Sequence, residues 1–116
     1  MDRLARYRIL LEDRLREFQR LYNLQPTPGV EAHCVFDEDR GHYLLIDLGW
    51  AGKKRVKRTI LYARIVEGKV LIEDDWTEQG LANELLATGV PSEDIILAFQ
   101  HPFLRSLPET REASLI

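Results

Sequence analysis

The chain has 116 residues, of which 45% are hydrophobic and 30% charged, enough for one domain whose core needs no disulfide or metal. Acidic residues outnumber basic ones by 19 to 16, which gives a net charge of −3. Proteins that bind duplex DNA unaided usually carry a surplus of lysine and arginine, because neutralising phosphates supplies much of their affinity. Unaided DNA binding is therefore not the default expectation, although a local basic patch stays open.

The sequence predicts a cytoplasmic protein. No apolar run approaches the roughly 20 residues that span a membrane, and the N-terminus carries no secretory signal pattern. Cys34 is the only cysteine, so an internal disulfide cannot form, which fits a reducing compartment.

Residues 2–22 show the strongest periodicity. Their apolar side chains recur at steps of three and four, as on one face of a helix, and charged residues fill the other positions. Two prolines and a glycine at 26–29 must end this helix. The predicted buried stripe consists of Leu4, Tyr7, Leu11, Leu15, Phe18 and Tyr22.

Beyond residue 29 the pattern changes to strands. Short turns separate four segments rich in β-branched and aromatic residues, which favours an antiparallel meander over parallel crossovers. We expect these strands at residues 30–37, 42–50, 56–66 and 70–73.

The last third predicts short helices. Asp75 and Glu78 resemble a capping box that would start a helix there, and Gly89 suits its end. Residues 95–99 fit either a last strand or a buried helix. The fold class is therefore α+β, with a long N-terminal helix packed on a curled antiparallel sheet, in one domain spanning 1–116.

Two acidic patterns invite a catalytic interpretation. Glu73 and Asp75 could share a hard cation on one strand face, but acids at a strand-to-helix junction more often cap the helix. Asp47 with Glu67 and Lys69 matches the pattern of metal-dependent nucleases. We disfavour a nuclease, because residues 67–69 have the composition of a hairpin turn rather than of one rigid strand.

The histidines and the cysteine do not have zinc-site spacing, and no glycine-rich phosphate loop is present. His33 and Cys34 are adjacent on a predicted strand, so their side chains should point to opposite faces. We therefore predict no catalytic residues, no metal and no cofactor.

One dense basic stretch occurs at a predicted hairpin. It could contact phosphates, or it could be a solvated turn or a partner contact, and the negative net charge favours the second interpretation. Its basic residues are Lys53, Lys54, Arg55, Lys57 and Arg58.

Several segments together resemble the XisI family over nearly the whole chain. They include residues 29–37 (GVEAHCVFD), 61–65 (LYARI), 73–80 (EDDWTEQG) and 89–95 (GVPSEDI), and their order and spacing carry the resemblance more than any one of them. Further matches are Tyr7-Arg8, Tyr43-Leu44-Leu45 leading to Gly49-Trp50, Arg55-Val56, and Leu97-Ala98-Phe99.

The resemblance implies a factor that controls excision of the fdxN DNA element in cyanobacteria, where a separate recombinase cuts the DNA. It also implies an XisH-type partner protein and no established catalytic residues. We therefore predict a non-catalytic accessory protein that binds such a partner, with indirect or weak DNA contact and possible homo-oligomers. The alternatives are a DNA-binding regulator that uses the basic hairpin and, less favoured, the nuclease. Aromatic residues dominate interface hot spots, so the partner-binding candidates are Trp50, Tyr62, Trp76 and His101. The sequence equally allows both tryptophans to be core anchors of a small domain.

Overall fold

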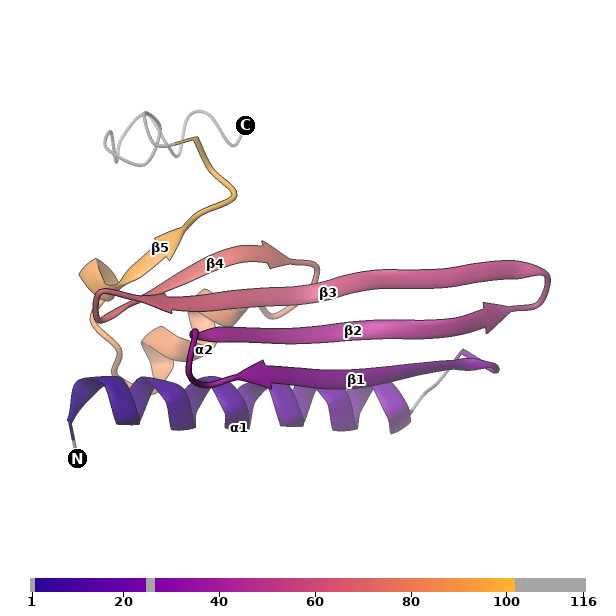
Figure 1. Ribbon diagram of the computed structural model, residues 1–116, viewed down its shortest axis with the longest axis horizontal. Coiled ribbons are helices and arrows are strands. Elements are labelled where there is room, and N and C mark those ends of the chain that lie inside the picture. The colour runs from indigo at the N-terminus through magenta and orange to yellow at the C-terminus, as the bar shows by residue number, and fades with distance from the viewer. Residues whose placement is uncertain (1, 25–26, 102–116) are drawn as a thin grey trace.

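The computed structural model describes residues 2–24 and 27–101; residues 1, 25–26 and 102–116 of the expected domain lie outside this part. Two helices and a single five-stranded sheet make an α+β fold, as predicted. Figure 1 shows the long helix α1 beside β1 and the short helix α2 behind the strands. The elements are α1 (Arg3–Leu24), β1 (Val30–Asp37), β2 (His42–Ala51), β3 (Lys54–Val66), β4 (Lys69–Asp75), α2 (Leu81–Ala87), the 3-10 turn η1 (Ser92–Asp94) and β5 (Ile95–Leu97).

The strands follow one another across the sheet in chain order. The first four are antiparallel, which confirms the meander, but β5 pairs with β4 in parallel, so the sheet is mixed. The ambiguous segment after residue 94 is therefore a strand. Its parallel pairing becomes possible because α2 and η1 return the chain to the starting end of β4.

The core lies between α1, α2 and one face of the sheet. The helical stripe is confirmed in its centre, since Tyr7, Leu11, Leu15 and Phe18 are buried. Leu4, by contrast, is 44% exposed at the first turn of α1. From His42 to Leu48 on β2 every second side chain is buried, so this part of the strand presents one face to the helices and the other face away from them. No helix of the described residues is long and apolar enough to cross a bilayer.

The free edge of β1 is joined to α1 by side-chain amides. The Asn23 amide accepts a hydrogen bond from Ala32 N (3.0 Å) and donates one to Ala32 O (3.1 Å). Gln19 Oε1 accepts another from Cys34 N at 2.7 Å. These contacts fix the angle between the helix and the first strand, because they tie both partners at two successive edge positions.

Candidate functional site

The predicted basic hairpin is the tip of the β2–β3 arm, and Figure 1 shows this arm extending past the end of α1. The strands pair up to Ala51 and Lys54, so the turn consists of Gly52 and Lys53. All five basic residues are exposed: Lys53, Lys54, Arg55, Lys57 and Arg58.

Both arginines of the arm bind within it. Arg58 Nε and Nη2 each lie 2.8 Å from Oδ2 of Asp47, a carboxylate only 4% exposed. Arg55 donates to the Gly49 carbonyl at 3.0 Å, and its guanidinium lies 5.6 Å from the centroid of the Trp50 ring. Fixed arginines rigidify the arm, and its lysines carry the charge that a ligand would meet.

A groove opens where α1 ends beside the base of the arm, and we call it the Tyr22–Trp76 groove. It has a volume of about 580 Å³. Trp76 is 74% exposed, the largest exposure among the large hydrophobic residues of the described part. Burial, followed by the Asp47 charge, raises the pKa of Tyr22, which keeps its hydroxyl neutral. The lining residues are Tyr22, Arg58, Thr59, Ile60, Asp74 and Trp76.

The loop that holds Trp76 is ordered by Asp75. Its carboxylate accepts hydrogen bonds from Thr77 N (2.9 Å), Thr77 Oγ1 (2.6 Å) and Leu81 N (2.7 Å). The Trp76 backbone N–H donates to Ile60 O at 2.9 Å. The indole is therefore presented on a backbone fixed at both sides.

The predicted helix start at Asp75 and Glu78 is wrong. The helix begins only at Leu81, and Gly80, with φ of 80°, precedes it without a side-chain cap. Asp75 still satisfies the first helical N–H, but from six residues away across a loop. The prediction failed because it assumed that Asp75 and Glu78, three residues apart, form a capping box at the start of the helix, whereas the Asp75 carboxylate reaches Leu81 N across the loop.

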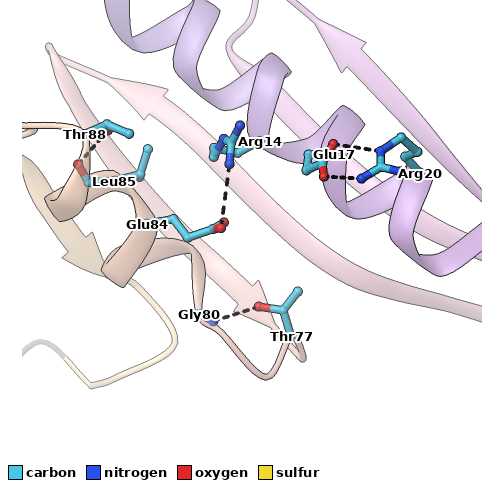
Figure 2. A network of polar contacts seen from close by, with 8 residues as sticks. All are labelled: Arg14, Glu17, Arg20, Thr77, Gly80, Glu84, Leu85 and Thr88. Carbon is cyan, nitrogen blue, oxygen red and sulfur yellow. Dashed lines mark hydrogen bonds and ion pairs between the residues drawn. The ribbon is translucent and has the colours of Figure 1, made fainter.

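An ion pair links α2 to α1, and a hydrogen bond closes the loop on itself (Figure 2). Arg14 on α1 lies 3.7 Å from Glu84 on α2, and Thr77 Oγ1 accepts from Gly80 N at 3.1 Å. The ion pair links the helix that carries Tyr22 to α2, which follows directly on the loop that carries Trp76.

The four partner-binding candidates do not form one surface. Tyr62 Oη lies 2.7 Å from His42 Nδ1 on the sheet face away from the helices, and by strand alternation Trp50 belongs to that face too. Trp76 lies in the groove beside α1, and His101 is exposed beyond β5. Tyr22 was not predicted as a groove residue, because the helical pattern already accounts for it as a core residue; its ring is partly buried against the core and also lines the groove.

The nuclease arrangement is not formed. Glu67 and Gly68 are the hairpin turn, as expected. Asp47 pairs with Arg58 near the other end of β3, which places it roughly 30 Å from Glu67 at about 3.3 Å per residue. Among residues 2–24 and 27–101, no three His, Cys, Asp or Glu side chains are grouped to hold a metal ion.

The remaining polar candidates have structural partners. Glu73 accepts a hydrogen bond from Arg64 at 3.0 Å. His33 Nε2 lies 3.0 Å from Glu31 Oε2 in an exposed pair. Burial raises the pKa of the Cys34 thiol to about 11, so it is a protonated thiol and a weak nucleophile at neutral pH.

These features define a small α+β protein whose helices cover one sheet face and whose distinctive surfaces are a lysine-tipped arm and an aromatic groove. The chain belongs to the XisI family, since it matches the family described as XisI protein over residues 1–110.

Two solved structures from Anabaena variabilis ATCC 29413 have the same fold. A XisI-like protein is 31% identical, with a TM-score of 0.83 over 89% of this chain and 93% of its own. The fdxN element excision controlling factor XisI is 40% identical, with a TM-score of 0.79 over 90% of this chain and 99% of its own. No curated protein sequence matches the chain.

Proposed function

We propose that this chain is a non-catalytic factor that controls excision of a DNA element, and that it acts by binding an XisH-type partner protein. Membership of the XisI family supports this function, as does 40% identity to a protein named as an fdxN element excision controlling factor.

The observation that carries the binding step is the exposure of Trp76 beside Tyr22. An indole that is 74% exposed on a fixed backbone loses little conformational entropy when a partner covers it. Arg58 and Asp74 at the same groove offer a hydrogen-bond donor and an acceptor around an apolar centre. This combination is typical of interface hot spots, where an aromatic anchor is ringed by polar groups.

Co-expression with the XisH-type protein tests the proposal. We expect the two chains to co-purify, and Trp76→Ala to weaken the complex about 30-fold or more, the equivalent of a hot-spot loss of about 2 kcal/mol. Leu86→Ala, at another exposed apolar position on α2, is the matched control and should leave binding unchanged. Two separate chromatographic peaks at micromolar concentration would contradict the proposal, as would a Trp76→Ala complex of undiminished affinity.

A second candidate function is DNA binding through the arm. Lys53, Lys54 and Lys57 are exposed on a projecting hairpin, and lysine side chains commonly contact phosphates. If this function holds, binding to duplex DNA weakens steeply with salt, and replacing the three lysines by Ala lowers the slope of log K against log salt by up to about 2.7. An electrophoretic mobility assay without any shift at low salt would remove this candidate.

A further inference from the structure

The sheet face that points away from α1 and α2 carries an apolar stripe, which we call the outer face. On β2 the buried side chains alternate with partly exposed ones, and the latter define this face. Val35, the β1 neighbour of Leu44, is 48% exposed there, and Trp50 is 54% exposed near the arm tip. The stripe consists of Val35, Leu44, Ile46, Leu48, Trp50 and Tyr62.

Both described helices lie on the opposite face, where α1 and α2 contribute Leu11, Leu15, Leu81 and Leu85 to the core. Within residues 2–24 and 27–101, no helix covers the outer face. Soluble monomers seldom expose contiguous apolar patches of more than a few hundred Å², and such patches commonly mark interfaces.

The charges beside the stripe are ordered across the sheet. Glu31 on β1 and Lys57 on β3 are the two neighbours of Leu48, one on each side. Asp37 and Arg64 are likewise the two neighbours of His42. The outer face therefore has acidic residues on β1, basic residues on β3 and, between them on β2, apolar side chains with His42 at one end. Asp37 and Arg64 also pair within the chain, with Arg40 and Glu73.

A face with this order is complementary to itself. A two-fold axis parallel to β2, placed above the outer face, reverses the order of strands and keeps the position along them. It lays β1 of one copy over β3 of the other, so Glu31 faces Lys57 and Asp37 faces Arg64 in the second molecule. Such an isologous contact repeats each ion pair twice.

In this arrangement the strands that overlap are β1, β2 and β3, which have 8, 10 and 13 residues. With about 3.3 Å per residue and about 4.8 Å between strands, they cover roughly 490 Å² before the side chains are added. A standard interface buries about 800 Å² on each partner, so this contact belongs to the small interfaces.

We propose that the occupant of the outer face is a second copy of this chain, held in a two-fold dimer by sheet-on-sheet packing. Tyr22 and Trp76, the aromatic residues of the Tyr22–Trp76 groove, are not part of the stripe, so this contact does not depend on the proposed function. A dimer would present two grooves and two basic arms, which doubles the contacts that one assembly can make.

Sedimentation equilibrium of the full chain tests the dimer. We expect a dimer at micromolar concentration that Leu44→Glu converts to monomer, whereas the control Leu86→Glu, on α2, stays dimeric. Trp76→Ala also stays dimeric, which separates this proposal from partner binding. A wild-type chain that is monomeric at 100 µM overturns the proposal. If Leu44→Glu also abolished binding of the XisH-type protein to that monomer, the occupant of the outer face would be the partner protein and not a second copy.

Charge reversal tests the symmetry itself with variants at exposed positions. Lys57→Glu and Glu31→Lys should each raise the dimer Kd about tenfold, because each puts two like-charged pairs into the contact. The double variant restores both pairs with opposite polarity and should return the Kd to near the wild-type value. Additive weakening in the double variant would overturn the two-fold geometry.

Discussion

The buried contact between Tyr7 and Asp94 should dominate the attachment of the N-terminal helix to the last part of the domain. The Tyr7 hydroxyl donates a hydrogen bond to Asp94 Oδ2 at 2.5 Å, and both residues are at least 95% buried. Arg3 lies 3.7 Å from the same carboxylate, but its side chain is 61% exposed. Tyr7→Phe removes the hydroxyl and leaves Arg3, a solvated partner, beside the buried carboxylate.

The expected loss is large for a single oxygen. A hydrogen bond to a charged group contributes about 1.5–3 kcal/mol, and the carboxylate left behind adds a desolvation penalty. We expect Tyr7→Phe to lower the free energy of unfolding by about 2–4 kcal/mol, a substantial part of the 5–15 kcal/mol typical of a domain. Tyr62→Phe, at the partly exposed contact with His42, should cost less than about 1 kcal/mol.

Urea denaturation followed by circular dichroism measures both variants. Burial, followed by the hydrogen bond to Asp94, raises the pKa of Tyr7. The folded state therefore favours the neutral phenol, so the stability from Tyr7 is complete below about pH 10 and is lost as pH rises through the folded pKa. A loss below about 0.5 kcal/mol for Tyr7→Phe at pH 7, or a loss equal to that of Tyr62→Phe, would contradict this prediction.

Three further predictions concern single positions. Gly49→Ala should destabilise the domain by more than about 2 kcal/mol in urea titrations, because the added Cβ would lie 1.9 Å from the Gly29 carbonyl oxygen. In the control Gly52→Ala the added Cβ meets no atom within 4 Å, so this variant should cost about 1 kcal/mol. Burial and the neighbouring Glu38 carboxyl raise the pKa of Glu12, so its negative charge at pH 7 opposes folding. Glu12→Gln should therefore raise the urea midpoint at pH 7 and leave it unchanged below pH 4. With a pKa of about 11, Cys34 should react with a disulfide reagent at pH 8 at least tenfold more slowly in the native chain than in urea; equal rates would refute this.

Local patterns predicted most of the fold. The spacing of Tyr7, Leu11 and Leu15 established the long helix, and turn residues such as Gly41 and Gly68 established the hairpins, because each signal lies within a few residues. The parallel strand after residue 94 stayed ambiguous, since three residues are too few for a period and its partner β4 is distant in the chain.

The candidate surfaces were only partly predictable. The basic stretch 53–58 was visible in the sequence, but the bonding of Arg58 to Asp47 depends on the register of β2 and β3. The separation of Trp50 from Trp76 could not be deduced, because the place of Trp50 follows from alternation along β2 and that of Trp76 from the Asp75 loop.

The amides of Asn23 and Gln19 have a consequence for how the protein behaves when crowded. An unoccupied strand edge is a template on which further chains can add strands and grow into fibrils. Here the N–H groups of Ala32 and Cys34 are already bound by α1, so the helix takes the place of a sixth strand and ends the sheet there. The last turns of α1 thus protect the chain against open-ended polymerisation, and their loss would expose β1 to every other copy in the cell.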